Sequence, residues 1–247
     1  MQWWHDPNFS HGFFVPMFSA YVIWLKRDHL RELAPSPSWY GIPILIAGLL
    51  LLMLGNFGAE LFLSRSSLLF VIAGLVITFM GWAHQREILF PWLFLILMIP
   101  LPAIIFSQIT FPLQTLASIL AASMLRALGV PVLLQGHIII IPAMPLEVAE
   151  ACSGIRSLLS LVTLTIIYGY LMETSVSLRV VLALASIPIA VIANSLRIVG
   201  TGLVVQYWSP DKAEGFFHAF SGWLIFVVSL IMLFLLHRLL RTFWREA

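Results

Sequence analysis

Long apolar stretches, separated by short charged segments, run along the whole chain. Most of them approach the ~20 residues that a helix needs to cross a bilayer. None alternates polar and apolar residues as a barrel strand does, and lipid leaves the backbone no other spanning structure than a helix. The pattern therefore predicts an all-α polytopic membrane protein. Its apolar stretches are Gly12 to Leu25, Gly41 to Ala59, Ser66 to Ala83, Ile88 to Leu125, Ser157 to Met172, Val180 to Leu196 and Gly215 to Leu236.

The block from Ile88 to Leu125 is long enough for nearly two crossings, so its breaks decide the number of spans. Ser107 and Gln108 follow a Pro-Leu-Pro sequence, which predicts one span from Ile88 to about Ile105. The remainder, Ile109 to Leu128, carries polar side chains and favours an interfacial or re-entrant helix on the outer side. The total is seven transmembrane helices, with eight as the alternative. The prolines in this block are Pro91, Pro100, Pro102 and Pro112.

The segment from Val130 to Glu150 differs in amino-acid composition from the apolar stretches. It holds three prolines, a glycine and a run of β-branched residues. This composition predicts a short extracytoplasmic β-hairpin just before the helix that carries the cysteine. The chain has no internal repeat and no low-complexity linker, so residues 1–247 are treated as one domain.

Composition narrows the class further. Of 247 residues, 61% are hydrophobic and 10% charged, against roughly 45–50% and about 25% in soluble domains. A soluble domain is excluded, and nucleic-acid binding is a poor interpretation. Basic residues concentrate on the cytoplasmic side of membrane proteins. The two basic clusters, which follow the first and last spans, are therefore predicted to be cytoplasmic: Lys26, Arg27 and Arg31, and Arg238, Arg241 and Arg245.

The single cysteine, Cys152, stands where the predicted outer loop becomes a span. The positive end of a helix dipole favours the thiolate, and Arg156 follows one turn later. Gly154 leaves room for a substrate backbone. The alternative is that Cys152 is a small buried hydrophobe. Because a free thiol facing an oxidising compartment is a liability unless it is used, its position favours a nucleophile.

Arg197 lies inside the apolar stretch from Val180 to Tyr207. A guanidinium within a span costs at least a few kcal/mol, so such residues usually face an aqueous cavity or a partner. Asn194, three residues earlier, shares its helical face and could orient it. The alternative is an arginine that snorkels to the interface near Trp208. Arg156 and Arg197 are the two basic residues whose place the orientation rule does not explain.

His218 opens the last span from the same outer side. The charge assignments thus put Cys152, Arg197 and His218 at one membrane face, on consecutive spans. A thiolate can attack a carbonyl, an imidazole can exchange protons with nucleophile and leaving amine, and a cation can stabilise the oxyanion. His237 falls on the cytoplasmic side, away from this site. No His, Asp or Glu spacing resembles a metal site, so neither a metal nor a cofactor is expected.

Three motifs carry a family resemblance: Ala-Cys-Ser-Gly-Ile-Arg at 151–156, Asn-Ser-Leu-Arg-Ile at 194–198 and Phe-Phe-His-Ala-Phe-Ser-Gly at 216–222. In this order they resemble the exosortase/archaeosortase family of integral-membrane cysteine transpeptidases. The resemblance implies a catalytic triad of Cys152, Arg197 and His218, with Ser153 beside the cysteine in support. The family is generally drawn with about eight helices.

The resemblance also implies a substrate and a location. Substrates of the family carry a C-terminal sorting signal that consists of a short motif, Pro-Glu-Pro in the bacterial branch, a hydrophobic helix and a basic tail. The enzyme would cleave near the motif at the outer face of a bacterial cytoplasmic membrane and pass the new C-terminus to an acceptor of unknown identity. Such enzymes often occur in bacteria that make exopolysaccharide.

Two other functions remain open from the sequence alone. One is an exopolysaccharide assembly or export component of the membrane without covalent chemistry. The scarcity of charges deep in the spans, Arg197 apart, argues mildly against it. The other is a lipid-linked glycosyl or acyl transferase that uses His218 rather than the thiol. Only the protease interpretation requires Cys152 to be reactive and accessible from outside.

Overall fold

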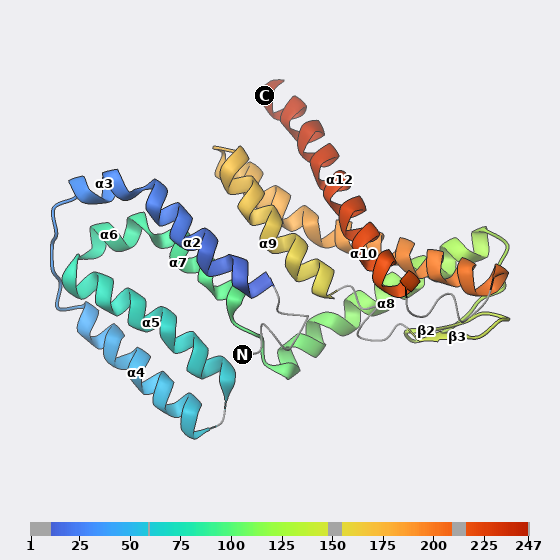
Figure 1. Ribbon diagram of the computed structural model, residues 1–247, viewed down its shortest axis with the longest axis horizontal. Coiled ribbons are helices and arrows are strands. Elements are labelled where there is room, and N and C mark those ends of the chain that lie inside the picture. The colour runs from blue at the N-terminus through green and yellow to red at the C-terminus, as the bar shows by residue number, and fades with distance from the viewer. Residues whose placement is uncertain (1–10, 59, 148–154, 209–215, 247) are drawn as a thin grey trace. The chain divides into compact units, whose positions relative to one another are not determined.

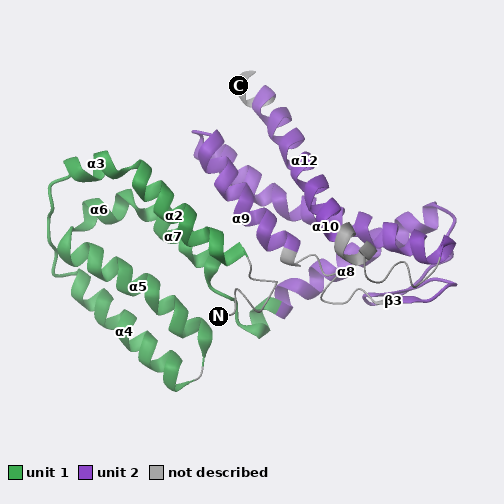
Figure 2. Cartoon of the chain, in the orientation of Figure 1, with its two compact units in different colours: residues 1–106 green, residues 107–247 purple. Residues whose placement is uncertain are grey.

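The computed structural model describes residues 11–58, 60–147, 155–208 and 216–246. These residues divide into two compact units, 1–106 and 107–247 (Figure 2). The first unit contains α2 (Phe14–Leu25), α3 (Arg27–Glu32), α4 (Gly41–Phe57), α5 (Leu61–Phe79), α6 (Trp82–Glu87), α7 (Leu89–Phe94) and the 3₁₀ helix η2 (Leu95–Met98). Helix α8 (Ala103–Ala127) begins in the first unit and continues into the second. The second unit adds β1 (Leu133–Gln135), β2 (Ile138–Ile140), β3 (Pro145–Glu147), α9 (Ile155–Met172), α10 (Val176–Tyr207) and α12 (Phe216–Glu246) (Figure 1).

The helical membrane class predicted from the sequence is confirmed. Four helical segments of the described chain are long and apolar enough to cross a membrane, and four shorter apolar helices accompany them. The exact number of crossings, seven or eight, stays a prediction. The four long segments are Leu61–Phe79, Ala103–Ala127, Val176–Tyr207 and Gly222–Thr242.

Glycines allow α4 and α5 to pack with their backbones close together. Gly41, Gly48 and Gly55 recur every seven residues on one buried face of α4. A Cβ added at Gly41 would lie 2.5 Å from the Thr78 nitrogen of α5, and one at Gly55 would lie 2.4 Å from the Ser64 nitrogen. From the other side, a Cβ at Gly74 would lie 2.7 Å from the Leu45 nitrogen. Lipid supplies no hydrophobic drive for helix association, so such close backbone packing is what holds the pair together.

The predicted span from Ile88 to Ile105 is not one helix. The chain forms α7, then the short η2, and is not helical again until α8 begins at Ala103. Side-chain hydrogen bonds connect α7 to its neighbours: Ser19 Oγ of α2 donates to the Pro91 carbonyl of α7 at 2.9 Å, and Trp92 Nε1 of α7 donates to the Leu69 carbonyl of α5 at 2.9 Å. The chain is interrupted at the Pro-Leu-Pro sequence, as expected, but the next helix begins at Ala103, so the expected end of a span at about Ile105 is wrong.

Helix α8 is continuous over 25 residues, about 37 Å at the usual rise of about 1.5 Å per residue. The expected start at Ile109 is therefore also wrong, and by length and composition α8 can cross a membrane. Its polar residues do not end the helix because they bond within it. The hydroxyls of Thr115, Ser118 and Ser123 each donate to the carbonyl four residues earlier.

The predicted hairpin is present and has a third strand. Strands β1, β2 and β3 form an antiparallel sheet in that order, with Leu133 opposite Ile140 and Ile138 opposite Glu147. Gly136, with φ of 62°, takes the left-handed conformation in the β1–β2 turn. The sheet is joined to α8 and α10 by a shared core in which Ile139 of β2 and Leu125 of α8 are fully buried.

If the glycine contact holds α4 to α5, Gly74→Ala must push the helices apart, since the nearest atoms to the new methyl are backbone. We expect a loss of about 1–3 kcal/mol in the free energy of unfolding, measured by denaturing the purified protein in detergent micelles. Gly200→Ala in α10 is the matched control, because no described atom lies within 4 Å of a Cβ at that position. Equal stability of the two variants would contradict the packing role of Gly74.

Candidate functional site

Arg197 lies well inside α10, ten residues before the helix ends at Tyr207. It is partly buried. A Cβ added at Gly222 of α12 would lie 3.8 Å from Arg197 Nη2 and 3.9 Å from its Cζ. The guanidinium therefore lies against α12 at the one position in that turn where no side chain occupies the space.

Asn194 is buried, with 4% of its surface exposed, and lies one turn before Arg197 on the same side of α10. Both residues have interaction partners within the structure. The next residue, Ser195, is 1% exposed and donates its hydroxyl to the Val191 carbonyl of its own helix at 2.8 Å. This region of α10 therefore carries several buried polar groups, as a site within a span requires.

Another side of α10 is fixed by apolar packing. Ile198, Val199 and Val205 belong to a buried core that α10 shares with α8 and the sheet. At Gly202 the contact is tight, since an added Cβ would lie 3.2 Å from a methyl of Leu125 and 3.3 Å from one of Leu146. This packing sets the rotation of α10 and thereby directs Arg197 toward α12.

His218 is the third residue of α12, and its side chain lies outside the described part of the structure. Its position in the helix is four residues before Gly222, so both positions share one face. They are separated by about 6 Å along the axis. The structure therefore brings Arg197 together with the face of α12 that carries position 218.

Cys152, Ser153 and Gly154 lie outside the described residues, and so does the side chain of Arg156. The described part of α9 begins at Ile155, three residues after the cysteine. Helices α9 and α10 pack on each other and are joined by a connection of only three residues, so they run antiparallel. Ile155 lies about 26 Å from the end of α9, and Arg197 about 32 Å from the start of α10. Ile155 and Arg197 therefore both lie far from the connection between the two helices.

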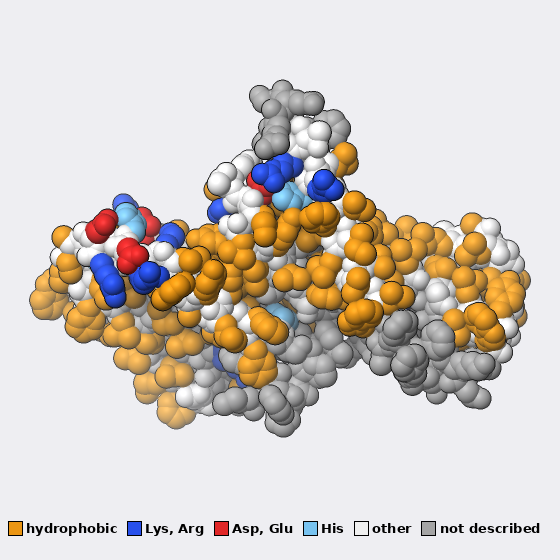
Figure 3. Space-filling view, turned by 45° about the horizontal axis from the view of Figure 1, so that its top comes forward, with side chains coloured by type: hydrophobic (Ala, Val, Ile, Leu, Met, Phe, Trp, Pro, Cys, Tyr) orange, Lys and Arg blue, Asp and Glu red, His pale blue; other side chains and the backbone are white. Residues whose placement is uncertain are grey.

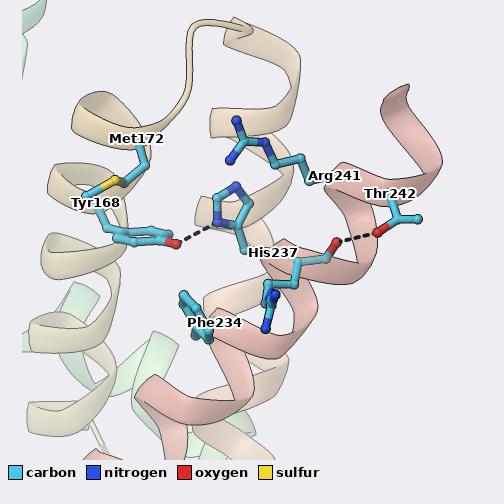
Figure 4. Close-up of a pocket in the computed structure, with 7 residues that line it drawn as sticks. Tyr168, Met172, Phe234, His237, Arg241 and Thr242 are labelled. Carbon is cyan, nitrogen blue, oxygen red and sulfur yellow. Dashed lines mark hydrogen bonds between the residues drawn. The ribbon is translucent and has the colours of Figure 1, made fainter. Parts of the chain in front are cut away.

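A second polar cluster, at the other end of these helices, was not predicted from the sequence. The Tyr168 hydroxyl lies 2.6 Å from His237 Nδ1 (Figure 4). His237 Nε2 in turn lies 2.6 Å from Glu173 Oε1. Arg241 Nε is 3.7 Å from the same carboxylate oxygen. The side chains of His237 and Glu173 are 5% and 10% exposed. Because 64 residues separate them, no local spacing could have indicated the pair.

Arg179 closes the end of α9 beside this cluster. Its guanidinium donates to the Glu173 carbonyl and, at 3.3 Å, to the Tyr170 carbonyl. Cationic side chains that bond the last carbonyls of a helix also interact favourably with its dipole. Among the described residues, no group of three or more His, Cys, Asp or Glu side chains could hold a metal ion.

The family model for transmembrane exosortases matches residues 3–235 of the chain. The match includes all the candidate site residues. No curated protein and no solved structure matches the chain.

The Tyr168–His237 contact can be tested by a double-mutant cycle with Tyr168→Phe, His237→Ala and the double variant. If the hydroxyl and the imidazole are hydrogen-bonded, the losses in unfolding free energy should be non-additive by about 1 kcal/mol. The measurement is denaturation of the full-length protein in micelles. Strictly additive losses would contradict the bond. Tyr207→Phe with His237→Ala serves as the control cycle, for which additivity is expected because Tyr207 is exposed at the end of α10.

Proposed function

Because the chain belongs to the transmembrane exosortase family, we propose that it is a membrane-embedded cysteine protease or transpeptidase. Its substrates would be proteins with a C-terminal sorting signal. It would cleave them at the outer face of a bacterial cytoplasmic membrane and pass the new C-terminus to an acceptor. The observation that supports this most is the guanidinium of Arg197, which lies against Gly222 on the face of α12 that carries His218.

The proposed reaction begins at Cys152. The imidazole of His218 takes the thiol proton, and the thiolate attacks the scissile carbonyl to form a tetrahedral oxyanion. The guanidinium of Arg197 stabilises this oxyanion, and Asn194 keeps the guanidinium in place. The oxyanion collapses to a thioester as His218 gives its proton to the leaving amine. Water, or an amine or hydroxyl group of the acceptor, then attacks the thioester and releases the thiol.

The residues around the cysteine have supporting roles in this proposal. The positive charge of Arg156 and the start of α9 favour the thiolate over the thiol. Gly154 leaves space for the substrate backbone beside the nucleophile. Ser153, next in the chain to Cys152, is the remaining member of the proposed site.

The orientation of the substrate follows from the same charge rule as that of the enzyme. A C-terminal helix with a basic tail inserts with the tail on the cytoplasmic side. The Pro-Glu-Pro-type motif that precedes the helix then emerges on the outer face. This is the side on which the basic clusters of the chain predict Cys152, Arg197 and His218 to lie.

The nucleophile can be tested by co-expressing the enzyme with a signal-bearing substrate and following its processing. We expect Cys152→Ala and Cys152→Ser to abolish cleavage, because a hydroxyl without the acidity of a thiol is a far weaker nucleophile here. The mass of the processed C-terminus distinguishes hydrolysis from transfer. Normal cleavage by Cys152→Ala would overturn the assignment of Cys152 as the nucleophile. An export or assembly component instead predicts that the substrate is not processed and that Cys152→Ser keeps the cellular function of the wild type.

The role of Arg197 can be tested through its neighbour Gly222. In Gly222→Ala the new Cβ would lie 3.8 Å from Nη2, an ordinary contact, so processing should stay close to the wild-type rate. In Gly222→Leu the side chain takes the space of the guanidinium, and we expect a loss of about 100-fold, similar to the loss of an oxyanion donor. Denaturation of both variants controls for folding. A well-folded Gly222→Leu variant with normal processing would exclude the proposed role of Arg197.

A further inference from the structure

A cavity of about 560 Å³ opens between the end of α9 and the second half of α12 (Figure 4). Tyr168 and Met172 line it from α9, and Phe234, His237, Arg238 and Arg241 line it from α12. It belongs to the second unit alone, at the end remote from Arg197. None of its residues takes part in the proposed cleavage reaction.

The one described carboxylate beside this cavity is already engaged. Glu173 Oε1 lies 2.6 Å from His237 Nε2 and 3.7 Å from Arg241 Nε, and its side chain is 10% exposed. The guanidinium of Arg179 is used at the end of α9, where it donates to two carbonyls. The cavity itself therefore presents two cationic side chains, Arg238 and Arg241, and no exposed acidic side chain among the described residues.

The arginines are exposed, and apolar surface adjoins them. The side chain of Arg241 is 55% exposed, and Arg238 Cζ lies 5.9 Å from the centre of the Phe234 ring. Phe234 and Met172 are 50% and 59% exposed. Figure 3 shows basic side chains gathered at this end of the second unit, with hydrophobic side chains directly below them. A ligand that fits this lining has an anionic group and an apolar part.

The position in the helix indicates where such a ligand would come from. The apolar segment of α12 runs from Gly222 to Thr242, so Arg238 and Arg241 lie in its last turn and a half. Arginines at this depth reach the level of the lipid headgroups. On the lipid-exposed side of α12, Ile231 and Leu235 continue the apolar surface away from the arginines, with more than half of each side chain exposed.

We propose that this cavity binds the phosphate of an anionic phospholipid, with the acyl chains lying along α12. Basic pockets between transmembrane helices bind such headgroups in the leaflet they face. A basic peptide is disfavoured here because Arg238 and Arg241 repel it while Glu173 is turned inward. The proposal does not depend on the cleavage reaction, so either can fail without the other.

The test uses the full-length protein in detergent micelles, titrated with dioleoylphosphatidylglycerol or with dioleoylphosphatidylcholine. Native mass spectrometry counts the bound lipid, and the thermal midpoint reports stabilisation. We expect the wild type to bind the anionic lipid preferentially. Arg238→Gln with Arg241→Gln should weaken that binding about 30-fold, from roughly fivefold for each charge at the surface.

The matched control is Arg27→Gln with Arg31→Gln, which removes two exposed charges from the other basic cluster and should leave the tight binding unchanged. An equal loss in this control would mean general surface attraction and would overturn the proposal. An equal thermal shift with glycerol 3-phosphate or inorganic phosphate would overturn it in favour of a site for soluble anions.

The single variant Arg238→Gln tests the site even if the double variant does not fold. Arg238 makes no ion pair with any described residue, so its replacement leaves the Glu173 contacts in place. About a fivefold loss is expected, and an unchanged affinity for the anionic lipid would contradict the proposed site.

Discussion

Hydrocarbon offers no water to an unpaired polar group, and this constraint accounts for most of the structure. Where the chain forms only a short helix, as at α7, side-chain hydrogen bonds connect it to its neighbours: Ser19 bonds the Pro91 carbonyl of α7, and Trp92 of α7 bonds the Leu69 carbonyl of α5. Where helices are continuous but carry hydroxyls, as in α8, those hydroxyls bond the preceding turn. Most charged side chains are left to the helix ends and connections, and Arg197 is the exception that a purely structural account leaves without a role.

Glycine solves two different packing problems in this chain. In the first unit, Gly41 and Gly74 let two helix backbones meet at distances that no Cβ permits. In the second unit, Gly222 leaves a space that a guanidinium fills, with distances of ordinary contact. The first use stabilises a helix pair by dispersion and close packing, whereas the second admits a charge to the interior of a helical group. A glycine in a span can therefore accommodate a polar neighbour as well as a helix.

The sequence predicts those features that depend on local pattern. The helical class, the hairpin and the helix that begins after Cys152 follow from hydrophobicity, turn residues and propensity. The polar residues Ser107 and Gln108 led to a wrong end for the span before them. The sequence does not show that polar side chains in this segment bond their own helix. The contact between Glu173 and His237 could not be predicted, since it joins residues 64 positions apart through the packing of α9 on α12. Arg197 could be singled out from energetic cost alone, but its contact with Gly222 required the structure.

The second unit holds a partly buried arginine at one end and exposed arginines at the other. The proposed substrate would extend to both ends. At one end a partly buried guanidinium is held against α12, where it can meet a developing anion. At the other, Arg238 and Arg241 are exposed, and a substrate with a basic tail would bring its own charges to the same membrane face. Like charges repel each other with little screening when they are closer than a Debye length of about 8–10 Å. If both proposals hold, an anionic lipid in the cavity would neutralise the two arginines and lower their repulsion of a basic tail at this membrane face.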